Sequence, residues 1–362
     1  MIVRIAIGGD VSVKAECEAL FEKGEGKALF GDVTDIFLNS DFALVNLECA
    51  VTDSDTPIKK IGPNLKAPLG TARALKQAGV THCILSNNHI FDYGVKGIRD
   101  TLTELEKQGL FHTGFGENEI DSRKDLILTD GKIKVAVIAV CEHEYSYALE
   151  NRMGARPYDP YDTNDDIAEA KKDADYVIVI YHGGKEECRY PSPRLLKACR
   201  SMVKHGADLV LCQHSHCIGC YEKFLQGHIL YGQGNFHFIH KKYENVNDQG
   251  YMWNTGLLAL VDIDKELRLE LIPTVVSGTS ITLAKGEMKE KILAELLERN
   301  GSIEDGSWQK HWQEFAHSQE RYRVVPEELR EEIAHFIDCE AHADVCREIY
   351  KTYNATNEIK TE

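Results

Sequence analysis

The sequence predicts an α/β fold in which strands and helices form stacked layers. Two observations carry this prediction. Short apolar runs rich in valine and isoleucine are typical of strands covered on both faces, and helical patterns lie between many of them. The runs cover residues 2–7, 43–48, 82–86, 133–140, 176–182 and 208–214. Hydrophobic residues make up 43% of the 362 positions, which is enough for a large core in one or two domains.

The helices and the later strands follow from local signals. In residues 95–110, apolar side chains recur at spacings of three and four, and Gly109 marks a helix end. Residues 191–206 begin with proline and end with glycine, the order that helix termini favour. Three further apolar runs lie close together between residues 227 and 276, and we expect them to pair as antiparallel strands.

The composition changes near Ala284, where charged helical segments begin, the last of them over residues 326–353. We expect a main domain over residues 1–284 and a helical C-terminal appendage over residues 285–362. Trp308 and Trp312 lie four residues apart and mark one helix face. That face could recruit a partner or a second copy of the chain, but packing onto the main domain is favoured because aromatic stripes are usually core.

Charge and cysteine content limit the class of protein. The net charge of −16 argues against nucleic acid as a partner, but not against a phosphorylated small substrate, because bound metals change the local sign. Eleven cysteines without framework spacing predict reduced thiols in a cytoplasmic protein, and the isolated pair Cys217 and Cys220 is interpreted as coincidence. We expect no signal peptide and no membrane segment, since no apolar stretch reaches 18 residues.

Polar side chains gather where five predicted strands end, at the edge where α/β sheets bind ligands. They are Asp10, Asn46 with Glu48, Asn88 with His89, His182, and His214 with His216. The members of the pairs Asn46–Glu48 and His214–His216 lie two residues apart, so each pair shares one face of its extended segment.

Each of these residues has an ordinary alternative. Asp10 could cap a helix that begins at Ser12. A strand-end glutamate such as Glu48 is usually solvated, His182 could be hydrogen-bonded in the glycine turn that follows it, and the pattern His214-x-His is weak alone. Together, however, they supply the carboxylate, amide and imidazole ligands of a two-metal hydrolase, with an unligated acid beside them.

Seven motifs occur in the order of one known family. They are GGDVSV, NLECAVTD, LSNNHIFDYG, GFGEN, YHGGKEECRYPSP, HGADLVLCQHSHCIG and ILYGQGNF, over roughly residues 1 to 280. The chain thereby resembles the CapA-like proteins, named for poly-γ-glutamate capsule synthesis, in the calcineurin-like metallophosphatase superfamily. The resemblance implies a four-layer α/β/β/α sandwich with a dinuclear metal centre at the strand ends, in place of the single doubly wound sheet that alternation alone favours.

The resemblance also assigns six metal ligands and one acid. The ligands would be Asp10 and His216 on the first metal, Glu48 between the metals, and Asn88, His182 and His214 on the second. His89 would stay unligated and protonate the leaving oxygen.

The first motif departs from the superfamily pattern. Asp-x-His is usual there, but this chain has Asp10-Val11-Ser12. The first metal therefore loses an imidazole, and we expect weak binding or a water in its place. Glu48 is one methylene longer than the usual bridging aspartate, so Asn46 could also contribute.

Two further residues keep two interpretations each. Asp92 could hold His89 in one tautomer or cap the helix that follows Gly94. Asn235 could point into the site as an additional ligand or serve a turn.

These features predict a dinuclear metal-dependent hydrolase that uses Mn, Fe or Zn. Its substrate would be a phosphate ester or, less favourably, an amide, in a small molecule or a polymer-derived compound. The reaction could be linked to capsule or poly-γ-glutamate metabolism. The alternative is a non-catalytic assembly or polymer-binding protein of capsule synthesis. The absence of a predicted membrane segment weighs against the alternative, because a partner in polymer export is expected near the membrane.

Overall fold

The structure is a computed structural model, which describes residues 2–142, 145–240 and 248–319 together with isolated residues further on. The chain divides into two compact units, Met1–Trp312 and Gln313–Glu362. Helix α10 (Gly286–Asp305) packs within the first unit through Ile292 and Leu296. The boundary expected after residue 284 stays a prediction, and most of the helix expected over residues 326–353 lies outside the described residues.

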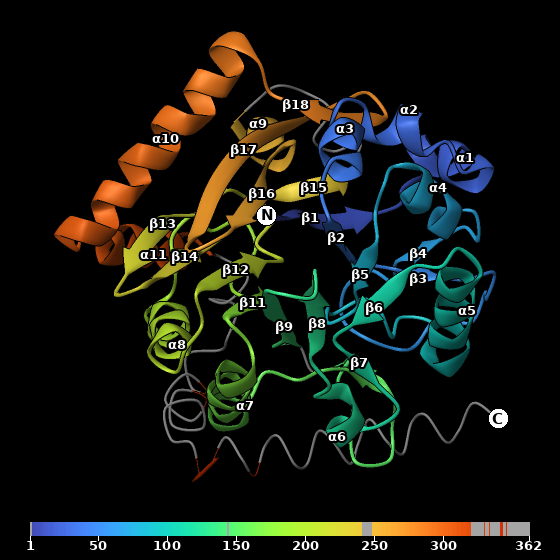
Figure 1. The fold of residues 1–362 in the computed structure, drawn as a ribbon, viewed down its shortest axis with the longest axis horizontal. Helices are drawn as coiled ribbons and strands as arrows, with labels where there is room; N and C mark the ends of the chain where they lie inside the picture. The colour runs from blue at the N-terminus through green and yellow to red at the C-terminus, as the bar shows by residue number, and fades with distance from the viewer. Residues whose placement is uncertain are drawn as a thin grey trace. The chain divides into compact units, whose positions relative to one another are not determined.

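Two mixed sheets form the centre of the first unit (Figure 1). The larger has the strand order β18-β17-β16-β1-β2-β5-β6, with β15 also paired to β1. Its strands are β1 (Val3–Ser12), β2 (Phe42–Leu47), β5 (His82–Ile84), β6 (Phe111–Thr113), β15 (Asn235–Phe238), β16 (Thr255–Ile263), β17 (Leu267–Ser277) and β18 (Ser280–Leu283).

The second sheet has the strand order β13-β14-β12-β11-β9-β8. Its strands are β8 (Leu126–Thr129), β9 (Lys134–Cys141), β11 (Tyr176–His182), β12 (Leu209–Gln213), β13 (Tyr221–Phe224) and β14 (Gly227–Leu230). Two short ribbons complete the strands, namely β3 (Ala50–Val51) with β4 (Lys66–Ala67) and β7 (Phe115–Gly116) with β10 (Gly154–Ala155).

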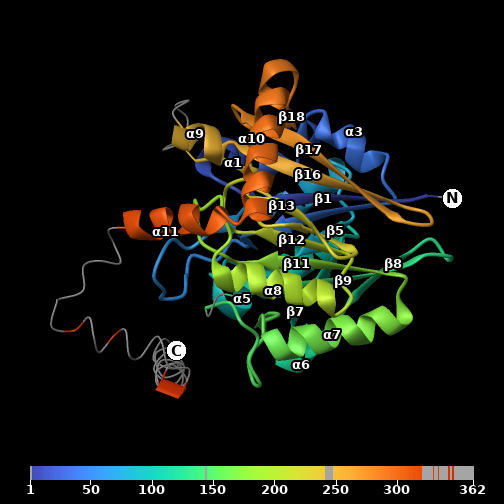
Figure 2. The same cartoon turned by 90° about the vertical axis from the view of Figure 1, so that its left-hand side faces the viewer.

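Helices cover the outer faces of both sheets. In Figure 2, α7 and α8 lie along one side of the sheets, and α1 and α3 lie along the opposite side. The remaining bounds are α1 (Ala15–Lys23), α2 (Gly26–Phe30), α3 (Val33–Leu38), α4 (Thr71–Gln77), α5 (Gly94–Lys107), α6 (Glu119–Ser122), α7 (Pro160–Asp173), α8 (Pro193–Lys204), α9 (Asp248–Trp253) and α11 (Trp308–Ser318).

Side chains alternate between two cores along each central strand. In β1, Val3, Ile5 and Ile7 pack between the sheets, whereas Ala6 packs in the cluster that contains the helices over the first sheet. Strand β9 does the same, with Val137 between the sheets and its neighbours against the cluster that contains α7 and α8 residues. Because each sheet is buried on both faces, its strands read as continuous apolar runs. The predicted four-layer α/β/β/α sandwich is confirmed.

The six predicted strands and the two predicted helices are present, with ends shifted by a few residues. The expectation that the later strands all pair antiparallel was wrong. Strands β16 and β17 are antiparallel, but β14 is parallel to β12 and β15 is parallel to β1. The run from residue 227 to 236 crosses from one sheet to the other at Gly234, whose φ is 75°. A Cβ there would lie 2.7 Å from the backbone oxygen of Thr255, so the crossing favours glycine.

Three smaller expectations also have an outcome. Trp308 is buried in the cluster on the outer face of the second sheet, which confirms the packing interpretation for that residue. The nine cysteines among the described residues are buried, and none of them forms a disulfide. Across the part of the chain that the structure describes, no helix is long and apolar enough to cross a membrane.

Candidate metal centre

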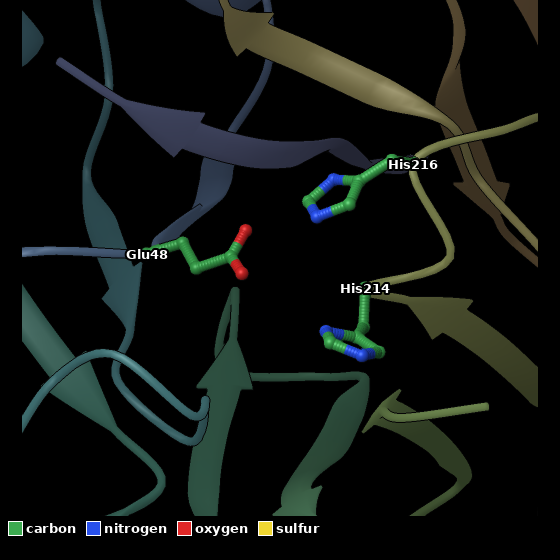
Figure 3. A group of neighbouring side chains, drawn as sticks. All are labelled: Glu48, His214 and His216. Atoms are coloured by element: carbon green, nitrogen blue, oxygen red, sulfur yellow. The ribbon is translucent and has the colours of Figure 1, made fainter. Parts of the chain in front are cut away.

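The predicted ligands converge at the carboxyl ends of strands from both sheets. Two groups have possible ligand atoms within 4.8 Å of one another, and Glu48 belongs to both. The groups are Asp10, Glu48 and His182, and Glu48, His214 and His216. In Figure 3 the carboxylate of Glu48 approaches from one side and the imidazoles of His214 and His216 approach from the other. This division of the ligands differs from the one implied by the resemblance, although both give Glu48 a shared position.

Asp10 lies in β1 between strands β2 and β15, in register with Asn46 on one side and Asn235 on the other. Its Oδ1 accepts a hydrogen bond from Asn46 Nδ2 at 2.6 Å, and its Oδ2 accepts one from the backbone N–H of His214 at 2.9 Å. Helix α1 begins at Ala15 without a side-chain cap. The alternative in which Asp10 caps a helix was therefore wrong.

Glu48 follows β2, and its side chain is completely buried. Neither carboxylate oxygen has a hydrogen-bond donor among the described residues. Burial, followed by the nearby charge of Asp10, raises the pKa of Glu48 well above its ordinary value. A buried carboxylate without a donor is costly, and a cation removes that cost. The donor set around Glu48 fits divalent metal ions.

His182 is the last residue of β11, and its ring contacts residues that follow or lie in strands of the first sheet. Its Nδ1 accepts a hydrogen bond from Asn46 Nδ2 at 2.9 Å, so the ring proton is on Nε2, which donates to Asn88 Oδ1 at 2.9 Å. The same Nε2 lies 3.4 Å from Glu48 Oε1. Burial lowers the pKa of His182 to about 4, which keeps the ring neutral. A neutral ring is the form that binds a metal, but binding at Nε2 would require the other tautomer, with the proton on Nδ1 and the hydrogen bonds to Asn46 and Asn88 rearranged.

Asn46 acts as a support in this arrangement. Its Nδ2 holds both Asp10 and His182, and its Oδ1 accepts a hydrogen bond from Asn87 Nδ2 at 3.0 Å. The amide oxygen that would bind a metal is therefore engaged with Asn87. These contacts give Asn46 a positioning role beside the ligands.

His214 and His216 follow β12 with φ values of 82° and 53°. Positive φ is uncommon for residues other than glycine, and it is found where surrounding contacts hold the backbone. His216 Nδ1 lies 2.8 Å from Asn235 Oδ1, an acceptor, so Nδ1 donates and Nε2 is left to bind a metal. Asn235 Nδ2 donates to the backbone oxygen of Trp253 at 2.9 Å. Asn235 thus orients a ligand, as residues behind metal-binding histidines usually do.

His89 and Asp92 form a second polar group in the loop after β5. His89 Nδ1 lies 2.6 Å from Asp92 Oδ2 and donates to it, so in the neutral ring Nε2 carries no proton. Burial lowers the pKa of His89 to about 4, although Asp92 opposes the change. Helix α5 has no side-chain cap, so the alternative in which Asp92 caps that helix was wrong.

Two residues near this group were not among the predicted site residues. Asn87 is fully buried, donates to the Leu47 backbone oxygen at 2.9 Å and accepts from the backbone N–H of His89 at 3.1 Å. Lys60 forms an ion pair with Asp92. The sequence places Lys60 next to Lys59 in a polar loop, and only the fold distinguishes the two.

Comparisons with known proteins point to one family. The family model described as "Bacterial capsule synthesis protein PGA_cap" matches residues 4–240. The "Capsule biosynthesis protein CapA" of Bacillus anthracis is 30% identical over 239 residues, which cover 64% of this chain and 58% of that protein. The "PGA biosynthesis protein CapA" of Bacillus subtilis (strain 168) is 29% identical over 313 residues, which cover 82% of this chain and 79% of that protein. This chain therefore matches less than two thirds of the length of the first of these relatives.

Among solved structures, a protein from Staphylococcus aureus that is provisionally named a 5′-nucleotidase has a TM-score of 0.47 and 14% identity. The match covers 82% of this chain and 58% of that one. The layered fold is defined by the strand pairing and the core clusters of this chain.

Proposed function

This chain belongs to the family of bacterial capsule synthesis proteins, and on that premise we propose that it is a dinuclear metal-dependent hydrolase of a phosphate ester. The observation that carries the proposal is Glu48, a fully buried carboxylate without a donor among the described residues, shared by two groups of possible ligands. A structural role alone would favour an apolar residue or a paired carboxylate at this position.

Six side chains would hold two divalent ions of Mn, Fe or Zn. They are Asp10, Glu48, Asn88, His182, His214 and His216. When bound, the ions supply Lewis acidity and an activated water. Asn46 would orient Asp10 and His182, and Asn235 would orient His216. With Ser12 in place of an imidazole, the first site would be the weaker of the two.

His89 would act on the leaving group. Its Nδ1–H is held by Asp92, so a proton for the departing oxygen would be carried on Nε2 of the doubly protonated ring, the form that Asp92 favours and burial opposes. Removal of the imidazole would therefore lower turnover without removing a metal ligand.

The experiment combines elemental analysis with a substrate panel. The purified chain would be reconstituted with Mn²⁺, its metal content measured, and its turnover measured with bis-p-nitrophenyl phosphate and p-nitrophenyl phosphate. We expect two ions per chain and measurable hydrolysis that falls in His89→Ala and in Asp10→Asn. Full activity in both variants, or no hydrolysis of either compound by the metal-loaded protein, would contradict the proposal.

A non-catalytic role is the second candidate, because the relatives are named for the biosynthesis of capsule and of PGA. In that role the chain would bind or help to assemble an anionic polymer. Binding of poly-γ-glutamate by a chain that takes up no Mn²⁺ would favour this function over hydrolysis.

A further inference from the structure

We propose that Lys60 is a positioning residue of the acid–base group, which fixes Asp92 and through it the ring of His89. The proposal rests on the function proposed above and adds a residue to the same site. Lys60 lies in the loop between β3 and β4, and only 3% of its side chain is exposed. Its ion-pair partner Asp92 is not exposed at all.

The ammonium group of Lys60 faces the loop that carries the metal-binding amide. It is paired with Asp92 Oδ1, donates to the backbone oxygen of Asn88 at 3.3 Å, and lies 3.2 Å from His89 Nδ1. An ammonium has three donors and no acceptor. Since its hydrogen bond goes to Asn88 and its ion pair to Asp92, Lys60 joins the ligand Asn88 to the pair His89–Asp92.

Asp92 is the centre of this arrangement. Its Oδ2 accepts hydrogen bonds from the backbone N–H of Leu65 and from His89 Nδ1, both at 2.6 Å, while Oδ1 pairs with Lys60. Contacts on both oxygens fix the plane of the carboxylate. Among the described residues no other contact holds Oδ1, so without Lys60 the carboxylate could rotate and the His89 ring would lose its fixed direction.

The loop that supplies Lys60 is itself attached to the same residue. The backbone N–H of Ile58 donates to the Asp92 backbone oxygen at 2.9 Å, and Asn64 Nδ2 donates to that oxygen at 3.1 Å. These two contacts flank Lys60 in the sequence and hold its backbone over the acid–base group. Burial of the Lys60 ammonium would be costly without its ion-pair partner Asp92, because an unpaired ammonium is strongly disfavoured in the interior.

The test replaces the buried lysine and its exposed neighbour in parallel. Lys60→Met removes the ammonium and keeps much of the side-chain length, and Lys59→Met is the matched control because Lys59 is exposed. We expect Lys60→Met to lower kcat by about 10- to 100-fold, the loss typical when an outer-shell partner of a metal ligand is removed. KM and bound Mn²⁺ should stay near the wild-type values, and Lys59→Met should match the wild type throughout.

Two further measurements separate positioning from a purely structural role. Lys60→Arg keeps a cation beside Asp92 and should recover part of the lost kcat. Long-range ¹H–¹⁵N spectra of the His89 ring should differ between the wild type and Lys60→Met, because the hydrogen bond to Asp92 changes. Unchanged ring signals with unchanged kcat, or a loss of thermal stability alone, would overturn the proposal.

The outcomes also distinguish this proposal from the proposed function. If the metal-loaded wild type hydrolyses none of the test compounds, the proposed function fails, while the His89 spectra still decide whether Lys60 fixes the ring. If Lys60→Met does not fold, the same spectra of Lys60→Gln decide, since a neutral amide cannot form the ion pair with Asp92. Ring signals identical to the wild type in Lys60→Gln would then contradict the proposal.

Discussion

At the scale of single residues, the neighbours Asn88 and His89 contact different partners and should therefore have different roles. Asn88 Oδ1 meets the Nε2 atom of the predicted ligand His182, whereas His89 Nδ1 is tied to Asp92. Asn88→Ala should therefore weaken Mn²⁺ binding at least about tenfold, and His89→Ala should keep the metal but lower kcat by about 10²- to 10⁴-fold. Titration calorimetry and steady-state kinetics check the two results. Equal loss of metal in both variants would contradict the assignment.

Ser12 gives a second prediction at this scale. Val11 packs in the core on the helix side of the first sheet, so Asp10 and Ser12 face the second sheet. Ser12 is buried, and its Oγ has no hydrogen-bond partner among the described residues. Ser12→His should supply the imidazole of an Asp-x-His pattern, and should tighten binding of the weaker of the two proposed Mn²⁺ ions in calorimetry.

The control for that variant separates the new ligand from its bulk. Both Ser12→His and Ser12→Leu overfill a packed position, so each should lower the free energy of unfolding by about 1–3 kcal/mol. Only Ser12→His should tighten Mn²⁺ binding. If the leucine variant tightens it equally, the effect does not come from an imidazole ligand.

At the scale of elements, the crossing at Gly234 places β15 and therefore Asn235. Gly234→Ala should lower the free energy of unfolding by more than about 2 kcal/mol, because alanine meets both an unfavourable φ and the Thr255 backbone. Gly131→Ala is the matched control, since its φ is 89° but nothing lies within 4 Å of the added Cβ. Urea denaturation of both variants measures the difference, and equal losses would show that the close approach to Thr255 is unimportant.

The elements also show how far the sequence could predict the site. Apolar runs predicted the central strands, and the position of Asp10, Glu48 and His182 at the ends of those runs predicted them as site residues. Both signals are local in the sequence. Pairing is not local, so the crossing of β15 to the first sheet could not be predicted from its apolar run. Lys60 was missed for the same reason. Its burial depends on Asp92, 32 positions further along the chain.

At the scale of the whole molecule, the proposed ligands come from both sheets. Asp10 lies in a strand of the first sheet, and Glu48 and Asn88 follow two others. His182 ends a strand of the second sheet, and His214 and His216 follow another. Metal bound between them would cross-link the sheets at one edge, and any ligand that binds only the folded state raises its stability. A site at 100 times its Kd adds about 2.7 kcal/mol to the free energy of unfolding.

Glu48→Gln tests that cross-link, because Glu48 is the side chain shared by both ligand groups. Without metal, the variant should unfold at a higher temperature than the wild type, since a buried amide costs less than a buried carboxylate without a donor. With Mn²⁺ the order should reverse, because the wild type gains the stabilisation of a bridging ligand and the variant loses most of it. Calorimetry in EDTA and in Mn²⁺ measures both transitions. An equal Mn²⁺-dependent rise in the two proteins would show that Glu48 does not join the sheets through metal.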